Sequence, residues 1–345
     1  MPIELLGPLQ RDALIDFLTS AFHLPKTAPF VAPRLLDWKY DEPRPDWQGS
    51  RSYAWMERGE IVAHACLCPA TYRMGTALVT GSYLIDWAAD RRFSGAGVLL
   101  LRKLASLFQM LLAIGGSADT QQILPKLGYR DAGELAYFAR VVRPWRQYQT
   151  DPFPRGWKGP LRLARNTVWS WAASPPVGPE WSCIPLAAFG MDQAALLEAE
   201  TPFPATCRNP ELMNFLLRCP TCAMSAYLIR RRENPCGWFV LSRVEGVARI
   251  TDLRIASTEP AWWRAAYGLA TQTALADPEV CELVTAASVP LRIDAIRGNG
   301  FRPRHTERVF LLDRQNLLMP HAPLDVALLD SDLAYLYDPQ YPYLT

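Results

Sequence analysis

The strongest constraint on the fold of this 345-residue chain is an internal repeat. Gly-Tyr-Arg at 128–130 precedes Phe138, and Gly-Phe-Arg at 300–302 precedes Phe310, so the offsets agree: 300 − 128 = 172 and 310 − 138 = 172. A fixed offset over a turn and the strand after it indicates two copies of one structural plan. The sequence therefore predicts two domains of similar build, which suits a length beyond that of one ordinary domain.

Each copy runs through the same order of predicted elements. Two helical segments come first, strands follow, and a strand, a helix, a strand, a short helix and a final strand close the copy. In the first copy this closing series is predicted at 79–88, 97–109, 110–116, 120–128 and 135–142. In the second copy it is predicted at 247–255, 262–276, 281–288, 290–300 and 308–313. Strands that alternate with helices of these lengths indicate an α/β fold.

The stretch 146–180 separates the copies. It is rich in Pro, Gly and Trp, which is typical of a linker. We therefore predict a first domain at 1–145 and a second at 181–345, whose aromatic C-terminal tail is expected to pack on the protein. Residues 140–165 hold seven basic residues against one acid, Asp151. This basic stretch suits an anionic membrane or a sugar phosphate, although a solvated linker explains it as well.

Charge and hydropathy limit the partners of the chain. The formal net charge is +2, which is too small for a protein devoted to binding DNA. The first residues carry acids and no basic segment ahead of an apolar stretch, so no secretory signal is predicted. The longest apolar run, at 95–116, contains Arg102 and Lys103 and is not predicted to span a membrane. These features predict a cytoplasmic protein.

The cysteines do not form a metal-binding pattern. Eight Cys residues in a chain without a secretory signal indicate free thiols. Cys219 and Cys222 have the spacing of half a zinc site, but no second pair with that spacing is present. We therefore predict no metal site.

A glycine turn in the first copy is the best candidate for a binding site. Residues 91–100 read RRFSGAGVLL and connect the strand at 79–88 to the helix after it. Gly95 and Gly97 let ligand oxygens approach the backbone, and the first N–H groups of a helix attract anions. Taken alone, so short a pattern fits a plain helix start better than a phosphate site.

The turn and its surroundings resemble the GNAT superfamily of acyl-CoA N-acyltransferases. Residues 92–97 match the superfamily's Q/R-x-x-G-x-G/A motif, and Lys-Leu-Gly-Tyr at 126–129 is similar to the stretch that closes the same domain. The resemblance implies two tandem GNAT-like domains, each a mixed, mostly antiparallel sheet flanked by helices. It also implies acetyl-CoA or another acyl-CoA as co-substrate, with the pyrophosphate held by main-chain amides. The cofactor-binding residues that it implies are Trp87, Arg92, Phe93, Ser94, Gly95, Ala96, Gly97 and Val98.

Two positions depart from this resemblance. Residues 258–263 of the second copy read TEPAWW where the glycine turn should be, and Glu259 would repel a phosphate. The second copy therefore resembles a degenerate domain, and one acyl-CoA site per chain is expected. In the first copy, Leu124 stands where the superfamily often has a tyrosine general acid. Leucine cannot donate a proton to the departing thiolate, so the general acid is left open.

Two residues are candidate general bases, because only the free amine of an ammonium acceptor attacks a thioester. Asp86 lies on the strand before the turn, where a carboxylate often serves in the superfamily, and a purely structural carboxylate is an equal alternative. His64 lies in a predicted strand. Histidine titrates near neutral pH, which permits catalysis, but a histidine bonded within a sheet is the commoner case.

These features predict an N-acyltransferase that moves an acetyl or longer acyl group from acyl-CoA to an amine, either a small molecule or a glycan precursor such as an amino sugar. The tandem layout is similar to that of Fem-type aminoacyl transferases and exopolysaccharide-associated acyltransferases. A Fem-like enzyme that uses aminoacyl-tRNA is one alternative, and it needs a wide basic surface. A non-catalytic CoA-binding or scaffold protein is another, which Leu124 permits. The oligomeric state is not predicted.

Overall fold

Two compact units make up the protein. A computed structural model of the chain describes residues 3–152, 156–172, 175–198, 202–318 and 323–345. By its contacts the chain divides into a first unit of 1–133, 204–207 and 307–322, and a second unit of 134–203, 208–306 and 323–345. Each unit is assembled from segments that lie far apart in the sequence.

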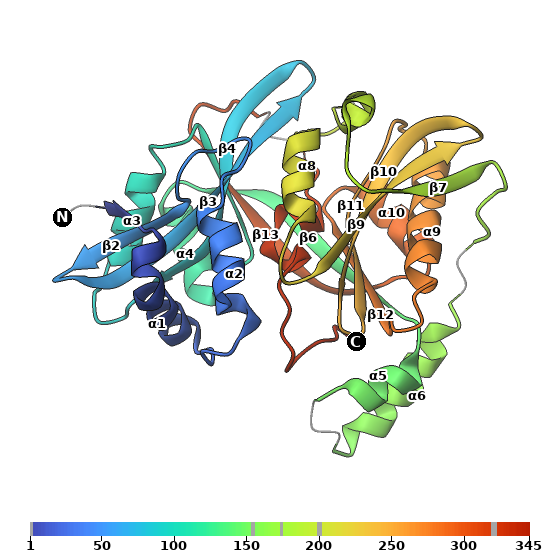
Figure 1. Ribbon diagram of the computed structural model, residues 1–345, viewed down its shortest axis with the longest axis horizontal. Coiled ribbons are helices and arrows are strands. Elements are labelled where there is room, and N and C mark those ends of the chain that lie inside the picture. Colours follow the sequence, from blue (N-terminus) through green and yellow to red (C-terminus); the bar gives the residue numbers. More distant parts are fainter. Residues whose placement is uncertain (1–2, 153–155, 173–174, 199–201, 319–322) are drawn as a thin grey trace. The chain divides into compact units, whose positions relative to one another are not determined.

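The first unit is a sheet with helices on both faces (Figure 1). Its strands, in hydrogen-bonded order, are β1 (Ile3–Leu5), β2 (Ser52–Glu57), β3 (Glu60–Met74), β4 (Ala77–Ala89), β5 (Met110–Ile114) and the end of β13 (Arg302–Asp313), while β8 (Ala205–Thr206) pairs with β3. Among these pairs only β4 and β5 are parallel. The helices α1 (Arg11–Phe22) and α2 (Pro33–Leu36) pack on one face, and α3 (Ala96–Leu104) and α4 (Ala118–Lys126) pack on the other.

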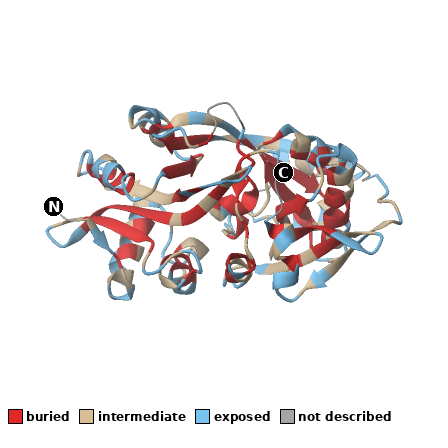
Figure 2. Cartoon of the chain, turned by 90° about the horizontal axis from the view of Figure 1, so that it is seen from above, coloured by how far each residue is buried: buried red, intermediate tan, exposed pale blue. Residues whose placement is uncertain are grey.

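The second unit repeats this plan. Its strands, in hydrogen-bonded order, are β6 (Arg130–Val141), β12 (Glu282–Ala287), β11 (Val247–Ile255), β10 (Asn234–Val244), β9 (Ala223–Arg231) and β7 (Trp181–Leu186). Only β11 and β12 are parallel. The helices α8 (Pro210–Leu217), α9 (Pro260–Leu275) and α10 (Pro290–Gly298) belong to this unit, and a short α7 (Ala194–Leu197) precedes them. In both units the strands form the buried layer, and the helices expose their outer sides (Figure 2).

Each sheet ends with the last strand of the other half of the chain. The last strand of the first copy, β6, pairs with β12 from Glu282 with Val141 to Ala287 with Ala136. The last strand of the second copy, β13, pairs with β5 over residues 309–313. This exchange gives β5 and β12 a hydrogen-bonded partner on an edge that would otherwise be open. It is also why the two units do not end at the predicted boundaries 145 and 181.

The predicted fold class is confirmed, since each half contains strands, a parallel pair joined by a helix, and a mostly antiparallel sheet. Residues 146–180, predicted as a linker, contain most of α5 (Pro144–Thr150) and all of α6 (Lys158–Ser170), which lie side by side (Figure 1). The helix predicted at 97–109 ends earlier, at Leu104. The Ser106 hydroxyl donates to the carbonyl of Lys103 at 2.7 Å, and such a bond competes with the next helical turn.

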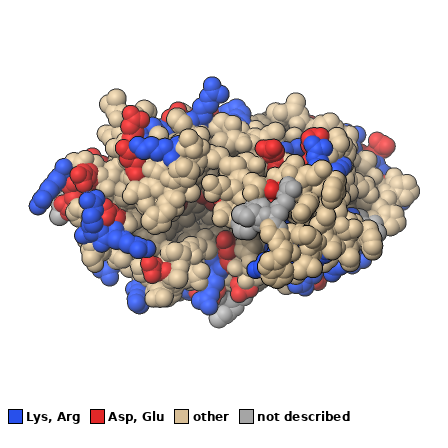
Figure 3. All heavy atoms as spheres, turned by 90° about the horizontal axis from the view of Figure 1, so that it is seen from below, with Lys and Arg blue, Asp and Glu red and all other residues tan. Residues whose placement is uncertain are grey.

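Charge is mixed on the surface. On the face drawn in Figure 3, Lys and Arg side chains lie among Asp and Glu side chains, and neither sign covers a continuous field. Nucleic acids are usually bound by a cluster of basic side chains. The face drawn in Figure 3 has no such cluster. Among the described helices, none is long and apolar enough to cross a bilayer.

Candidate functional site

The carboxyl ends of β4 and β5 separate in the first unit. The two parallel strands are paired from Gly81 with Met110 to Leu84 with Ala113. Beyond Leu84, β4 continues to Ala89 and pairs there only with β3 in the described part of the chain. The backbone groups on the β5 side of this stretch therefore have no strand partner. Ligands of open α/β sheets bind at the carboxyl ends of parallel strands.

A β-bulge lies in the same stretch of β4. Two residues, Asp86 and Trp87, stand opposite the single residue Ala65 of β3. Asp86 has a φ of 52°, a left-handed conformation that Asp adopts more readily than most residues. Trp87 packs with the core cluster beneath α3, whereas the Asp86 carboxylate contacts residues just after α2. The bulge thus directs two neighbouring side chains to opposite faces of the sheet.

The turn after β4 leaves helix-start amides free. Inside the turn, the N–H of Phe93 donates to the Asp90 carbonyl and the N–H of Ala96 donates to the Phe93 carbonyl. Ser94 and Gly95 are exposed, and no side chain caps α3. Because the positive end of the helix dipole lies here as well, these amides suit an anion. Within the described residues no acceptor bonds to the backbone N–H groups of Ser94, Gly95, Gly97 and Val98.

The two glycines of the turn have different roles. Gly95 has a φ of 85°, and a Cβ there would meet no atom within 4 Å, so glycine serves the left-handed backbone and the space in front of it is open. Gly97 has no such φ, but its Cβ would lie 2.9 Å from the Cβ of Ala89. The Trp87 indole N–H donates to the Gly97 carbonyl at 3.1 Å. Gly97 therefore allows α3 to pack closely on the end of β4.

Asp86 forms a buried ion pair. Its Oδ2 lies 2.5 Å from Lys39 Nζ, and the two side chains are 3% and 1% exposed. The Tyr40 hydroxyl donates to the same Oδ2 at 2.7 Å. Both partners belong to a π-helical turn over Asp37–Asp41, a rare conformation that is frequent at functional sites. In the described chain no donor bonds to Oδ1 of Asp86, so one carboxylate oxygen is held and the other is available.

The fold resembles solved acyltransferases. No protein-family model matches the sequence, and no curated protein matches it. A GCN5-related N-acetyltransferase from Anabaena variabilis aligns with a TM-score of 0.56 at 14% identity, over 90% of this chain and 72% of that one. An N-myristoyltransferase from Saccharomyces cerevisiae with bound myristoyl-CoA aligns with a TM-score of 0.58 at 11% identity, over 91% of this chain and 79% of that one. A probable N-acyltransferase from Enterococcus faecalis gives a TM-score of 0.57 at 11% identity, over 90% and 71%.

The chain has the GNAT fold. The resemblance inferred from residues 92–97 and 126–129 is thereby confirmed at the level of the fold. Within the GNAT fold of this chain, all seven predicted cofactor residues from 92 to 98 lie in one turn, and Trp87 contacts it through Gly97. Their surroundings differ: Trp87, Phe93 and Ala96 pack on the hydrophobic core, Val98 is half-buried, and Ser94 and Gly95 face solvent.

Arg92, the predicted cationic residue of the turn, is already paired. Its exposed guanidinium makes a two-pronged contact with the Asp90 carboxylate, at 2.9 Å from Nε and 2.6 Å from the terminal nitrogen. Hydrogen bonds from Arg92 lower the pKa of Asp90. The pair stiffens the turn, and Arg92 would have to leave Asp90 in order to contact a ligand.

His64 is bonded on both sides of its ring. Nε2 lies 2.8 Å from the Ser52 hydroxyl and Nδ1 lies 3.1 Å from the Asp86 carbonyl. The side chain is fully buried, and burial lowers the pKa of His64 to about 4. At neutral pH the imidazole is therefore neutral and fixed between β2 and β4. These contacts are those of a histidine that holds the sheet together, so Asp86 is the stronger candidate for the general base.

Sequence reasoning missed the partners of Asp86. Lys39 and Tyr40 lie far from it in the sequence, and the signal that could have found them is a lysine placed between two aromatic residues, Trp38 and Tyr40. It also missed a thiol pair on β3, where Cys66 and Cys68 lie 3.8 Å apart. The hydrogen bond from Cys66 lowers the pKa of Cys68 to about 7, which makes Cys68 the more reactive thiol of the pair.

Leu124 is fully buried in the core cluster beneath α3 and α4. The position where the superfamily often has its tyrosine thus packs the domain in this chain. Ser117, which begins α4, accepts a hydrogen bond from the N–H of Thr120 at 3.2 Å and caps that helix.

The matching turn of the second unit is closed by its own chain. The Glu259 carbonyl accepts the N–H of Trp262 at 3.1 Å and of Trp263 at 3.5 Å, and the N–H of Glu259 donates to the Ser257 hydroxyl at 3.1 Å. Pro260, the first residue of α9, has no N–H. The start of α9 therefore offers far fewer amides to a ligand than the start of α3.

The space between β11 and β12 is filled by the tail segment 324–330. The β11–β12 pairs end at Ile250 with Thr285. Further along β12, Ala287 pairs with Ala136 on one side and bridges to Ala327 of the tail segment on the other. The apolar residues that lie most deeply buried in the segment are Leu324, Val326, Ala327 and Leu328.

An ion-pair network fixes the tail segment. Asp325 lies 3.1 Å from a terminal nitrogen of Arg254 on β11 and 2.7 Å from one of Arg292 on α10. Asp330 lies 2.6 Å from Arg208, whose Nε also contacts Asp252 at 3.0 Å. All of these side chains are buried. The chain thus occupies the space between β11 and β12 with its own tail segment.

Proposed function

We propose that this chain is an N-acyltransferase that takes an acyl group from acyl-CoA and transfers it to an amine. One observation carries the proposal: four helix-start N–H groups without acceptors, in an exposed glycine turn, beside the unpaired end of β4. A pyrophosphate is the ligand whose charge and oxygens suit such a group of amides. The fold shared with acetyl- and myristoyltransferases agrees with this choice of ligand.

The same geometry gives each group a place in the reaction. The amides of Ser94, Gly95, Gly97 and Val98 would hold the pyrophosphate of acetyl-CoA or a longer acyl-CoA. The unpaired edge of β4 beyond Leu84 would polarise the thioester carbonyl. The amine nitrogen attacks the carbonyl carbon, the C–S bond breaks, and CoA leaves as a thiolate that takes its proton from solvent. The free Oδ1 of Asp86 would accept the proton of the amine, while Lys39 and Tyr40 hold Oδ2.

The acceptor that we propose to test first is an amino sugar or another glycan-precursor amine. This choice rests on the resemblance of the tandem layout to exopolysaccharide-associated acyltransferases. A panel that includes amino sugars, amino acids and simple polyamines would show which class supports turnover.

Calorimetry with acetyl-CoA tests the binding step. We expect Ser94→Glu to weaken binding by about tenfold, because a carboxylate at the exposed turn repels the diphosphate at the helix start. Ser94→Gln has the same shape without the charge and is the matched control, which should bind nearly as well as the wild type. No heat with wild-type protein, or equal affinity in the two variants, would refute the assignment of the turn.

A non-catalytic CoA-binding protein is the second candidate, because the buried Leu124 provides no hydroxyl near the thioester. Release of free thiol from acetyl-CoA in the presence of amines distinguishes the two. Binding without thiol release from any amine would favour the second candidate.

A further inference from the structure

The helix α6 carries its apolar stripe on the outside. Residues at 157, 161, 164, 168 and 171 recur at helical spacing and form one face of the helix and its two ends. A helix that packs on a domain normally turns such a face inward. Here it faces solvent: the exposed fractions are 76% for Trp157, 61% for Leu161, 58% for Val168 and 75% for Trp171.

Polar contacts attach the opposite face of α6 to the rest of the second unit. Asn166 is the buried residue of the helix, and its amide donates to Gln147 on α5 at 2.9 Å. Gln147 in turn donates to the Thr345 hydroxyl at 2.7 Å. The helix is therefore oriented by buried hydrogen bonds, and its outward apolar face is a fixed feature of the fold.

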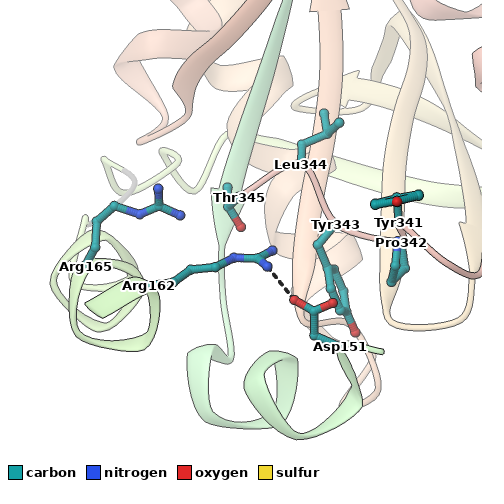
Figure 4. A pocket seen from close by; sticks show the side chains of 8 residues that line it. All are labelled: Asp151, Arg162, Arg165, Tyr341, Pro342, Tyr343, Leu344 and Thr345. Carbon is teal, nitrogen blue, oxygen red and sulfur yellow. Dashed lines mark hydrogen bonds and ion pairs between the residues drawn. The ribbon is translucent and has the colours of Figure 1, made fainter. Parts of the chain in front are cut away.

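Basic side chains flank the stripe. Residues 144–171 contain five basic residues and one acid, a local charge of 5 − 1 = +4. Arg162 and Arg165 line an open pocket of about 290 Å³ between α6 and the tail, together with Asp151 and Tyr341–Thr345 (Figure 4). Arg162 reaches toward Asp151 and pairs with it, whereas Arg165 does not (Figure 4).

Arg165 has no carboxylate partner within ion-pair distance in the described chain. Its guanidinium bonds to the Asn166 side-chain oxygen and lies 4.4 Å from the ring centre of Trp169. Burial, together with the nearby Arg304 and Arg162, lowers the pKa of Arg165. Of these arginines, Arg162 and Arg165 line the pocket, and an anion there would offset the repulsion between them.

We propose that α6, with Trp157 and Trp171 at its ends, docks the protein on an anionic bilayer surface. A helix with an apolar face, flanking Lys and Arg, and terminal Trp residues lies in the plane of the interface. Its 13 residues span about 20 Å, so it lies on the bilayer and does not cross it. Lipid phosphates would contact Lys158 and Arg165. A second copy of the chain is the poorer occupant, because an isologous contact would bring the basic residues beside the stripe, Lys158 and Arg165, close to their own copies.

Vesicle co-sedimentation with the full chain tests this proposal. We expect binding to vesicles of phosphatidylcholine with phosphatidylglycerol, little binding to phosphatidylcholine alone, and loss of binding at high salt. Leu161→Ser/Val168→Ser should weaken binding about tenfold or more, because two apolar side chains no longer enter the interface. The matched control is Leu9→Ser/Leu78→Ser, which removes apolar residues that are 98% and 60% exposed elsewhere; this control should bind like the wild type.

All four altered positions are exposed, so both double variants should keep the wild-type unfolding curve and the wild-type affinity for acetyl-CoA. The vesicle result is thus independent of the proposed transferase activity. No sedimentation with anionic vesicles, equal sedimentation with both kinds of vesicle, or equal losses in the two double variants would overturn the proposal. A wild-type dimer in solution that Leu161→Ser/Val168→Ser dissolves, without vesicle binding, would show that a second copy covers the stripe instead.

Discussion

The strand separations of the two units share a framework and differ in what satisfies their polar groups. In each unit two parallel strands separate, β4 from β5 and β11 from β12, and a helix starts at the same end. In the first unit the helix-start amides and the strand edge have no partner in the described chain. In the second unit the Glu259 carbonyl accepts hydrogen bonds from the helix-start amides, and the tail segment 324–330 bridges to the strand edge. The comparison teaches that two units with one framework can differ in where their backbone hydrogen bonds go, and this difference is the reason why only the first turn is proposed as a binding site.

Both strand separations also have a bulge with a buried aspartate. On β11 one extra residue lies between the pairs that Val240 and Leu241 make, and Asp252 follows it. Asp252 contacts three arginines, Arg208, Arg254 and Arg292, through both carboxylate oxygens. Asp86 has charged and hydroxyl partners on one oxygen only. The same position is thus a closed network in one unit and an available acceptor in the other.

Replacing the two aspartates should separate these roles with the largest effect. Asp86→Asn keeps the shape and tolerates the positive φ, but it removes the proton acceptor, so turnover should fall by about 10²–10⁴-fold. Asp252→Asn should leave turnover per folded molecule unchanged and lower the free energy of unfolding by about 3–5 kcal/mol, because buried arginines lose their partner. Steady-state thiol release and denaturant unfolding, measured on both variants, check this.

Asp86→Asn also leaves the Lys39 ammonium without its carboxylate, which would destabilise the first unit. The double variant Lys39→Met/Asp86→Asn removes that unpaired charge. It should have a higher free energy of unfolding than Asp86→Asn and the same low turnover. Wild-type turnover in either variant would exclude Asp86 as the base.

The ion pairs of the tail segment should contribute to the stability of the second unit. Asp325→Ala should lower the free energy of unfolding by about 3–5 kcal/mol, because Arg254 and Arg292 would remain buried without their shared carboxylate. The exposed Asp338→Ala is the control and should change stability little.

Burial raises the pKa of Asp325, but Arg292 and Arg254 outweigh it and hold that pKa below its ordinary value. Its contribution should therefore be present above about pH 4 and be lost as pH falls further, which acid unfolding of the variant and the wild type would show.

The fold could largely be predicted from the sequence, but the exchange of last strands could not. Apolar periodicity and the 172-residue offset are local signals, and they placed the parallel pairs and their helices. The strands at 135–142 and 308–313 follow equivalent turns and have similar apolar patterns. Nothing in either pattern distinguishes pairing with its own copy from pairing with the other, because the choice depends on long-range geometry.

The turn of the site was predictable for the same reason, since glycine at 95 and 97 acts locally. The partners of Asp86 were not, because Lys39 reaches it only through the packing of the turn after α2 on the sheet. The absence of the glycine motif and the negative charge of Glu259 predicted that the second turn binds no phosphate. The structure adds a contribution that the sequence did not show, because the Glu259 carbonyl accepts two N–H groups and Pro260 has none to offer.

The two units should also respond to pH in opposite directions. In the first unit, burial lowers the pKa of His64 from 6.5 to about 4. The unfolded chain then binds the extra proton between these values, so stability should rise with pH from about 4 to 6.5 by about 3 kcal/mol. In the second unit, burial raises the pKa of Glu282 from 4.5 to about 8. The folded state then keeps the extra proton, so stability should fall as pH rises from 4.5 to about 8.

Denaturant unfolding across pH 4 to 8 would measure both slopes. His64→Gln should remove the rise at low pH and leave the fall, while Glu282→Gln should remove the fall and leave the rise. Unchanged slopes in both variants would mean that other groups set the pH dependence of the two units.

The smallest expected effect comes from Glu259→Gln at the start of α9. An acidic side chain near a helix N-terminus stabilises by about 0.3–1 kcal/mol, so the variant should lose no more than that. Calorimetry should still find one acetyl-CoA per chain, because the Glu259 carbonyl, Pro260 and the tail segment are all retained. If charge repulsion alone kept the second turn empty, the variant would bind a second equivalent. A stoichiometry that stays at one would therefore show that the backbone and the tail segment keep acetyl-CoA out of the second unit. A stoichiometry of two would show that the negative charge of Glu259 does so.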